Sequence, residues 1–350
     1  MSMRSIVNDE MRIYPAFSDC AEAIVFCIND YYCPYFAVML QSVIEHASLS
    51  RKYDILIFHR DITAENQRII IDMGKGKEHI SIRFANVSSF ISDYSLYIGG
   101  KEDFSVDAYL RLLIPDMLND VYRKALYLDA DMMALADVGE LLNTDLDGFL
   151  LASSRDLYGL AEYYNPASKR KAYRDEILQL EKPDDYFIDG MLVFNLEVFR
   201  RHYTSELLLK MASSKKWLQH DQDVLNLVCN GGKAKLLHAQ WDVLFLPPFK
   251  AKSLPKQYQI ELDESYASPK IIHFGGNDKP WKTRGNPWDD LFWDTAAKTP
   301  FYKAIIYRIL DETNTKYKYA LERVKKSASY KTGRVITWLP RKMLGRIRKR

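Results

Sequence analysis

The feature that most constrains the fold is a repeated alternation of short apolar runs with segments whose apolar residues recur at helical spacing. Strands are expected over residues 21–30, 53–59 and 79–84. Helical spacing over 35–44 predicts a helix between the first two, and Asp61 or Thr63 can cap a second helix that ends at Gly74. Such strand–helix–strand repeats favour a mostly parallel sheet, whose binding sites lie at the carboxyl ends of the strands.

The same alternation continues through the second half of the chain. Further strands are expected over 147–154, 186–196, 233–238 and 270–274, and helices over 197–212 and 220–229. The chain has 350 residues, of which 47% are hydrophobic, and this is enough for one large core. We therefore expect an α/β fold with an N-terminal extension over 1–20, one domain over 21–290 with an insertion at 155–185, and a helical, basic amphipathic region over 291–350.

The net charge of +3 conceals two parts of opposite sign. The segment from Lys316 to Arg350 holds 13 lysines and arginines against one acid, a balance of +12, and the remaining residues carry −9. An acidic body disfavours nucleic acid as a partner, whereas the basic tail indicates an anionic surface. No apolar run has the length of a bilayer span and the start lacks an apolar leader, so we expect a cytoplasmic protein. Its four cysteines show no paired metal spacing.

An Asp-x-Asp pair directly follows the apolar run 125–128. Asp129 and Asp131 place two hard oxygen donors near one point, because the chain leaves the sheet there and need not alternate faces. Such donors suit Mn²⁺ or Mg²⁺ more than zinc, and an ion so held keeps positions open for diphosphate oxygens. Two alternatives remain on this pattern alone: Asp129 caps a turn and Asp131 is solvated, or Asp129 is a phosphatase nucleophile, which Met132 and Met133 disfavour.

Other polar residues stand where an α/β protein binds ligands. Arg111 lies on an otherwise apolar helix, where a guanidinium needs a carboxylate or phosphate partner. Asp30 ends the first strand, Asp221 opens a predicted helix, and His273 directly follows an apolar strand. Each also has a structural explanation, namely capping for the aspartates, an ion pair for Arg111 and a core hydrogen bond for the histidine.

Several segments together resemble the retaining glycosyltransferases of family 8, the group of bacterial lipopolysaccharide galactosyl- and glucosyltransferases and glycogenin. The resemblance covers roughly residues 22–285, with its motifs in the family's order. The segments are IVFCINDYYCPYFAVMLQSV (24–43), AYLRLLIPDML (108–118), LYLDAD (126–131), QHDQDVLNLVCNGG (219–232) and IIHFGGNDKPWK (271–282). The resemblance implies a single GT-A-type nucleotide-sugar-binding domain.

The resemblance also implies the site residues. The uridine, sugar and phosphates of the donor are expected to contact Asn29, Asp30, Arg111, Asp129, Ala130, Asp131, Gly276 and Lys279. The metal ion is expected to bind Asp129, Asp131 and His273. The transferred sugar is expected to contact Asp221 and Gln222. Lys279 would clamp the diphosphate, and the glycine pair that includes Gly276 permits close approach of the backbone to phosphate.

The chain departs from the family where the pattern F-N-[AS]-G becomes Phe187-Ile188-Asp189-Gly190. Ile188 replaces an amide that normally contacts the sugar, and Asp189 adds a carboxylate, so the identity of the hexose stays open. Retention of configuration requires a covalent intermediate or attack from the face that the diphosphate leaves. Asp189 or Asp221 is the candidate nucleophile in the first route, and the leaving phosphate takes the acceptor's proton in the second.

We therefore expect a metal-dependent retaining glycosyltransferase that moves galactose or glucose from a UDP-sugar to a saccharide acceptor, such as the cell-envelope glycolipid lipopolysaccharide. In the basic tail, apolar residues recur at helical spacing from Tyr317 to Ala328 and again from Ile336 to Ile347. This pattern predicts peripheral binding to the inner face of the plasma membrane. The alternative is a non-catalytic sugar-nucleotide-binding protein docked to the membrane. A metal nuclease is disfavoured because the acidic body offers no basic, aromatic groove.

Overall fold

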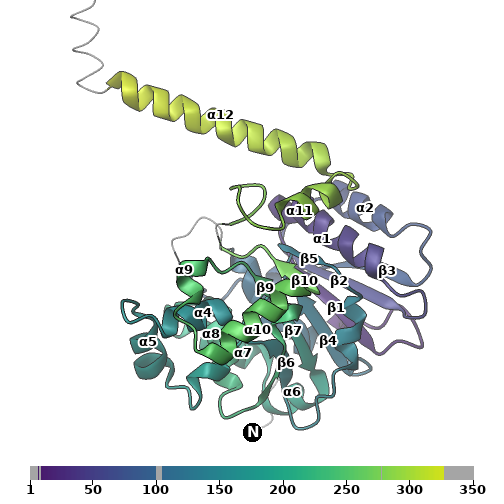
Figure 1. Ribbon diagram of the computed structural model, residues 1–350. Helices are drawn as coiled ribbons and strands as arrows, with labels where there is room; N and C mark the ends of the chain where they lie inside the picture. The colour runs from purple at the N-terminus through teal and green to yellow at the C-terminus, as the bar shows by residue number, and fades with distance from the viewer. Residues whose placement is uncertain (1–6, 8, 100–104, 277, 327–350) are drawn as a thin grey trace, which may run out of the picture. The chain divides into compact units, whose positions relative to one another are not determined.

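The computed structural model describes residues 7, 9–99, 105–276 and 278–326 (Figure 1). The chain forms two compact units, Met1–Phe301 and Tyr302–Arg350. The described part of the second unit is the helix α12 (Tyr302–Lys326), so the second apolar stripe expected in the tail lies outside the described residues. Across the described ranges, none of the helices combines the length and apolar character needed to cross a bilayer.

A seven-stranded sheet in the order β3-β2-β1-β4-β7-β6-β8 runs through the first unit (Figure 1). Its strands are β1 (Glu22–Cys27), β2 (Tyr53–His59), β3 (Ile80–Asn86), β4 (Lys124–Leu128), β6 (Leu151–Ser154), β7 (Met191–Asn195) and β8 (Ala234–Leu237). Only β7 runs antiparallel to its neighbours in this sheet, β4 and β6, whereas the other pairs are parallel. The expected α/β fold with a mostly parallel central sheet is therefore confirmed.

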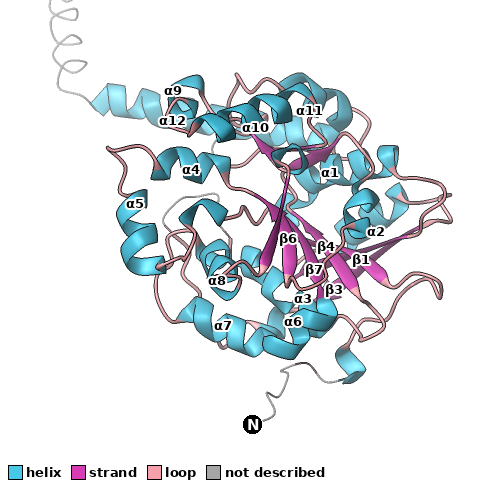
Figure 2. Ribbon diagram, turned by 60° about the horizontal axis from the view of Figure 1, so that its bottom comes forward, coloured by secondary structure: helices cyan, strands magenta, loops and turns pink. Residues whose placement is uncertain are grey.

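Helices cover both faces of this sheet (Figure 2). Side chains alternate along β1, so Ile24 and Phe26 join one apolar core while Ala23 and Val25 join the other. The first core is closed by α1 (Cys33–His46) and α2 (Ala64–Met73). The second is closed by a 3-10 helix (Val106–Leu113), α3 (Ile114–Met117), α6 (Leu196–His202), α7 (Ser205–Ser213) and α8 (His220–Val228). Burial on both faces explains why these strands are continuous apolar runs.

A second, three-stranded sheet carries part of the site. Its strands are β5 (Met132–Ala134), β10 (Ile271–His273) and β9 (Val243–Leu244), with β10 in the centre. β10 runs antiparallel to β5, so that His273 pairs with Met132, and the Phe274 amide donates to the Asp131 carbonyl at 2.8 Å. This sheet joins two segments that are far apart in the sequence.

Local contacts decide three details that bear on the sequence prediction. The single helix expected over 197–212 is wrong: it is divided into α6 and α7, because Thr204 is extended and its side chain accepts the Leu207 amide as an N-cap. Thr63 rather than Asp61 caps α2. The described part of the N-terminal extension does not stand apart from the domain, because Ile13 pairs with Leu118.

The remaining helices lie in the insertion and after it. They are α4 (Leu157–Tyr163), α5 (Arg170–Ala172), a π-helical turn (Tyr173–Leu178), α9 (Pro248–Ala251), α10 (Lys256–Ala267) and α11 (Asp289–Ala296). The insertion expected at 155–185 is therefore a folded helical segment. Asp156, two residues after the end of β6, caps α4 by accepting the Gly159 amide at 2.7 Å.

Candidate active site

A cavity of about 490 Å³ opens at the carboxyl ends of the central strands. It is lined by these residues that the sequence singled out: Asn29, Arg111, Asp129, Ala130, Asp131, Asp189, Asp221, Gln222, His273, Gly276 and Lys279. Asp30 is the one predicted site residue outside the lining. The fold therefore brings together residues from six separate segments of the chain.

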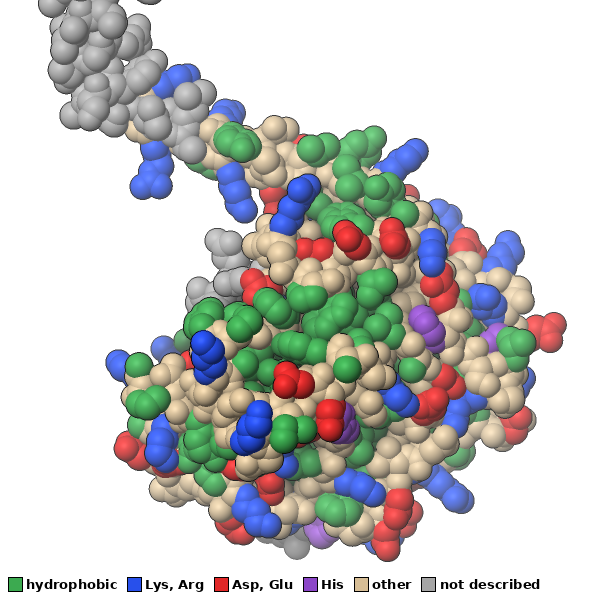
Figure 3. All heavy atoms as spheres, in the orientation of Figure 1, with side chains coloured by type: hydrophobic (Ala, Val, Ile, Leu, Met, Phe, Trp, Pro, Cys, Tyr) green, Lys and Arg blue, Asp and Glu red, His purple; other side chains and the backbone are tan. Residues whose placement is uncertain are grey.

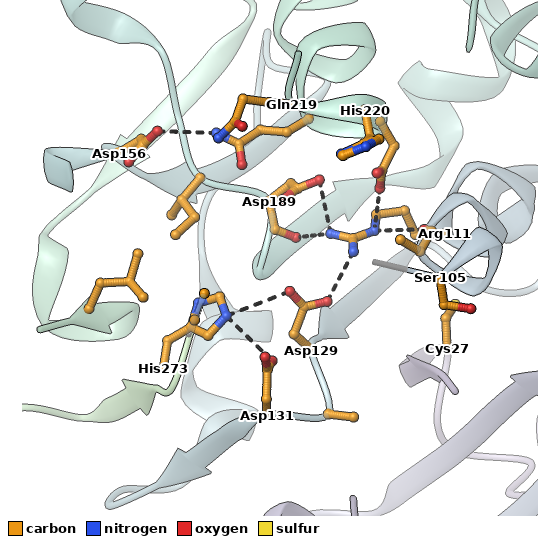
Figure 4. A pocket seen from close by; sticks show the side chains of 18 of the residues that line it. Cys27, Ser105, Arg111, Asp129, Asp131, Asp156, Asp189, Gln219, His220 and His273 are labelled. Carbon is orange, nitrogen blue, oxygen red and sulfur yellow. Dashed lines mark hydrogen bonds and ion pairs between the residues drawn. The ribbon is translucent and has the colours of Figure 1, made fainter. Parts of the chain in front are cut away.

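Three possible metal ligands lie together between the two sheets. Asp129 and Asp131 follow β4, and the pairing of β10 with β5 brings His273 beside them (Figure 4). Their ligand atoms lie within 4.8 Å of one another, with His273 Nε2 3.4 Å from Asp131 Oδ1 and 3.8 Å from Asp129 Oδ2. Two carboxylates and one imidazole form a donor set that suits Mn²⁺.

A buried carboxylate orients the imidazole of His273. Asp242 Oδ1 lies 2.8 Å from His273 Nδ1, so that Nε2 faces the two aspartates after β4. Gly190 leaves room for the ring, because a Cβ there would lie 2.5 Å from His273 Cε1. Burial lowers the pKa of His273, but the carboxylates of Asp242 and Asp131 outweigh it and raise the pKa well above its usual value. Asp242 was not predicted as a site residue.

A lysine neutralises the second aspartate of the pair. The Lys279 ammonium is ion-paired with Asp131 and donates to the Phe274 carbonyl at 3.0 Å. Burial raises the pKa of Asp131, but Lys279 and His273 outweigh it and hold the pKa far below its usual value. A carboxylate kept ionised offers the hard oxygen donors that a divalent ion binds. The residues present therefore fit a metal site.

Arg111 joins three carboxylates of the cavity (Figure 4). Its buried guanidinium lies 3.0 Å from Asp129 Oδ1, 3.0 Å from Asp189 Oδ2 and 2.7 Å from Asp221 Oδ2. It also stacks on Tyr127, with Cζ 4.3 Å from the ring centroid. Burial lowers the pKa of Arg111, but these carboxylates outweigh it and raise the pKa. The arginine therefore positions the acids that surround the expected sugar.

The added carboxylate of Asp189 lies beside another acid. Burial raises the pKa of Asp189 well above its usual value, and the charges of Asp221 and Asp129 add to this while Arg111 opposes it. Gln222 lies next to this group and donates to Asp156 Oδ2 at 3.2 Å. Asp156 was missed in the sequence, although its place after a predicted strand is the signal that identified Asp129.

A polar network occupies the end of the cavity near β1. The Asn29 amide donates to Asp107 Oδ2 at 3.0 Å, and Arg60 Nε lies 2.6 Å from Asp107 Oδ1. Asp30 points elsewhere: its carboxylate accepts from the Thr63 amide at 2.9 Å and from Asn66 Nδ2 at 2.8 Å. Asp30 therefore supports the start of α2, whereas Asn29 faces the cavity.

The fold and the site together define an α/β glycosyltransferase. The chain matches the family model Glycosyl transferase family 8 over residues 23–285 and belongs to that family. It is 22% identical over 290 residues to general stress protein A of Bacillus subtilis (strain 168), covering 79% of this chain and 93% of that protein. It is 26% identical over 178 residues to lipopolysaccharide 1,2-glucosyltransferase of Escherichia coli (strain K12), covering 49% of this chain and 48% of that protein.

Solved structures show the same fold. The bifunctional glycosyltransferase WbbM superposes with a TM-score of 0.75 at 26% identity, covering 85% of this chain and 53% of that chain. The galactosyltransferase LgtC, solved with donor and acceptor sugar analogues, superposes with a TM-score of 0.65 at 22% identity, covering 79% of this chain and 96% of that chain. The chain thus spans about half the length of WbbM and of the glucosyltransferase. The predicted family and the GT-A-type fold are confirmed.

Proposed function

We propose that this glycosyltransferase moves a hexose from UDP-hexose to a saccharide acceptor, with retention of configuration and with the help of a metal ion. The observation that carries the proposal is the convergence of Asp129, Asp131 and His273 in one cavity at the strand ends. Glucose or galactose as the hexose, and a cell-envelope glycolipid such as lipopolysaccharide as the acceptor, are supported by relatives named as a lipopolysaccharide glucosyltransferase and a galactosyltransferase.

The residues along the cavity support an arrangement for the bound UDP-hexose donor. Asp129, Asp131 and His273 would hold Mn²⁺ or Mg²⁺, which when bound neutralises the diphosphate and stabilises its departure. Lys279 stands beside this group and can exchange its ion pair with Asp131 for a phosphate oxygen. Gly276, at a φ of 68°, gives the backbone a left-handed turn where the diphosphate would approach.

The two ends of the donor have their own candidate partners. Asn29, and Asp30 through its support of α2, would define the place of the uridine, with Ala130 lining the cavity between nucleoside and metal. The hexose would lie against Asp189, Asp221 and the neighbouring Gln222. Hydrogen bonds from a polar wall of this kind discriminate between hydroxyl configurations.

Transfer breaks the bond between C1 of the hexose and the diphosphate oxygen, whose electron pair stays with the diphosphate. The acceptor oxygen then forms the new bond to C1. Asp189 and Asp221 are both ion-paired with Arg111, at 3.0 Å and 2.7 Å, and burial raises the pKa of Asp189. These contacts make each a poor nucleophile and support the same-face route, in which the leaving phosphate takes the acceptor's proton.

A donor-turnover assay tests the proposal. UDP-glucose and UDP-galactose are incubated with the protein in Mn²⁺ and in chelator, and release of UDP is measured. Turnover is expected only with the metal, and Asp131→Asn should remove it because a ligand is lost. Equal turnover in chelator would exclude the metal assignment. Donor binding without turnover would identify the non-catalytic sugar-nucleotide-binding protein instead.

We also propose peripheral binding to the cytoplasmic face of an anionic membrane. On α12, Tyr307, Leu310 and Tyr317 recur at helical spacing and are 63%, 51% and 72% exposed. Seven lysines and arginines lie on the same helix, at positions 303, 308, 316, 318, 323, 325 and 326. A basic helix with exposed aromatic and aliphatic side chains suits the interface of an anionic bilayer.

A further inference from the structure

One end of the cavity remains after the donor has been placed. Figure 4 shows Ser105 and Cys27 on one side and Asp156 and Gln219 on the other, with Arg111 and the metal ligands between them. The uridine belongs to the Ser105 side, where Asn29 also lies. The Gln219 side is the free end.

This free end is lined by side chains that no donor group requires. They are Tyr158, Arg170, Gln219 and Phe245, and they come from α4, α5, the start of α8 and the loop after β9. Tyr158 is held in place because the Lys250 ammonium donates to its hydroxyl, and Lys250 is itself ion-paired with Glu162 at 2.7 Å. An aromatic wall at the mouth of a site suits the apolar face of a sugar ring.

Arg170 differs from the other strong cations of the cavity. Arg111 has three carboxylate partners and Lys279 has Asp131, whereas the Arg170 guanidinium donates to the neutral amide oxygen of Gln219 at 3.2 Å. Among the described residues, no carboxylate lies within ion-pair distance of Arg170. Because a guanidinium stays charged at any physiological pH, the cavity carries at this end a positive charge that has no direct ion pair among the described residues.

The cavity also carries acids. Asp156, Asp189 and Asp221 line it together with Arg170. An anionic group that entered beside the donor would therefore be placed at Arg170 and excluded from the sugar-binding wall. A guanidinium pairs in two-pronged geometry with phosphate or carboxylate, which fixes orientation as well as affinity.

We propose that Tyr158, Phe245 and Arg170 form the acceptor subsite, and that it takes a saccharide carrying an anionic group, a phosphate or a carboxylate. The inference rests on the proposed function and deepens it, because it names the class of acceptor. The aromatic side chains contact the sugar ring and Arg170 binds the anion. The acceptor hydroxyl then faces C1 of the donor hexose.

Binding of three matched sugars tests this subsite. Methyl glucoside, methyl glucuronide and methyl glucoside 6-phosphate differ only at carbon 6, and calorimetry measures their affinity for the full chain loaded with Mn²⁺ and UDP. The wild-type protein should bind an anionic sugar about tenfold or more tightly than the neutral one, because charge-assisted hydrogen bonds exceed neutral ones. The comparison of glucuronide with phosphate separates the two possible anions.

Substitutions at two neighbouring positions of α5 give a matched comparison. Arg170→Gln should abolish the preference for the anionic sugar, and Arg170→Lys should retain part of it because the charge remains. Lys171→Gln removes an equal charge from the next residue, which is exposed and ion-paired with Asp175 at 2.6 Å. This control should keep the full wild-type preference.

The outcomes are distinguishable. Equal affinity for neutral and anionic sugars, binding of none of the three, or an unchanged preference in Arg170→Gln overturns the inference. Hydrolysis of UDP-hexose by the wild-type protein is measured separately, and its absence overturns the proposed function instead. If circular dichroism shows that Arg170→Gln does not fold, two other measurements test the inference. They are the sugar preference of Arg170→Lys and the salt dependence of the wild-type preference, because screening by salt must weaken an ionic contact.

Discussion

At the scale of single residues, the orientation of His273 depends on the carboxylate behind it. Asp242 contacts His273 Nδ1 at 2.8 Å, and its side chain has 0% exposed area. Such a contact fixes the tautomer and the ring plane of a metal-binding histidine, and its loss costs about ten- to a hundredfold in metal affinity. Asp242→Asn is expected to weaken Mn²⁺ binding by this factor, which electron paramagnetic resonance of free Mn²⁺ measures.

The control for this prediction is a carboxylate remote from the site. Asp120 is 72% exposed and is paired with Arg12, so that Asp120→Asn removes the same charge without contacting the imidazole. Mn²⁺ affinity should be unchanged in this variant. A folded Asp242→Asn protein that binds Mn²⁺ as tightly as wild type would show that the carboxylate has no part in orienting the ligand.

The stability of the polar network near β1 should depend on pH through Asp107. Burial raises the pKa of Asp107, but hydrogen bonds from Arg60 and Ser105 outweigh it and hold the pKa below its usual value. Because the folded pKa is the lower one, the carboxylate stabilises the fold above the unfolded pKa of about 3.9, and this contribution is lost as pH falls through the folded pKa. The difference in free energy of unfolding between wild type and Asp107→Asn should therefore shrink from about pH 6 to about pH 3.

Urea denaturation at several pH values measures this difference. A difference that stays constant over the whole range would mean that the Asp107 carboxylate has the same pKa in the folded and unfolded chains. The pairing with Arg60 would then contribute nothing net to stability.

The place of a single residue in the site was predictable where it depends on a neighbouring strand or helix in the sequence. Asp129 directly follows an apolar strand and His273 is the last residue of one, so their position at the binding edge follows from sequence. A buried arginine needs acids nearby, which made Arg111 a candidate, but its three partners are set by tertiary packing. Asp242 and Asp107 were not predictable, because each acts through a residue brought near only by the fold.

At the scale of elements, the chain directly before β7 has to approach the small sheet closely. A Cβ at Gly190 would lie 2.5 Å from His273 Cε1 and 2.9 Å from Asp242 Oδ2. Gly190→Ala is therefore expected to displace the imidazole, to lower Mn²⁺ affinity, and to destabilise the fold by about 1–3 kcal/mol through overpacking. Mn²⁺ titration and urea denaturation of the same protein measure both effects.

Gly139→Ala provides the comparison for this change. The new Cβ there would meet first the flexible side chain of Arg51, which can move away. Its effect on stability should be smaller, and Mn²⁺ affinity should not change. Wild-type metal affinity in Gly190→Ala would show that the approach of β7 does not position His273.

Helices and strands were predicted correctly where many consecutive buried residues give a long apolar pattern in the sequence. β2 was predicted at both ends, because all seven of its residues are buried and polar turns flank it. In the small sheet, β10 lies within the strand predicted over 270–274. β5 and β9 were not predicted, because strands of two or three residues have no measurable periodicity and are held together by pairing distant in sequence. The break between α6 and α7 rests on one capping side chain, which the apolar spacing over 197–212 concealed.

At the scale of the whole molecule, charge is distributed unevenly along the chain. Figure 3 shows acidic and basic side chains interspersed over the first unit, while basic side chains recur along α12. The segment from Lys316 onward holds 13 lysines and arginines against one acid. Family membership was predictable from the order of the motifs, and the α/β unit from the alternation of apolar runs. The function of the basic tail follows from neither pattern, so it needs a separate test.

Truncation before Tyr317 is expected to abolish sedimentation with anionic vesicles while turnover of UDP-hexose with a soluble acceptor survives. The site lies within Met1–Phe301, and each removed lysine or arginine near an anionic surface contributes about 1 kcal/mol to binding. Vesicles of neutral lipid serve as the control, and they should bind neither the full chain nor the truncated one. Binding that depends on the tail's charge must also fall steeply with salt. If the truncated protein still sediments with anionic vesicles, the membrane contact lies before Tyr317, and the rest of the basic tail acts only as a solvated end.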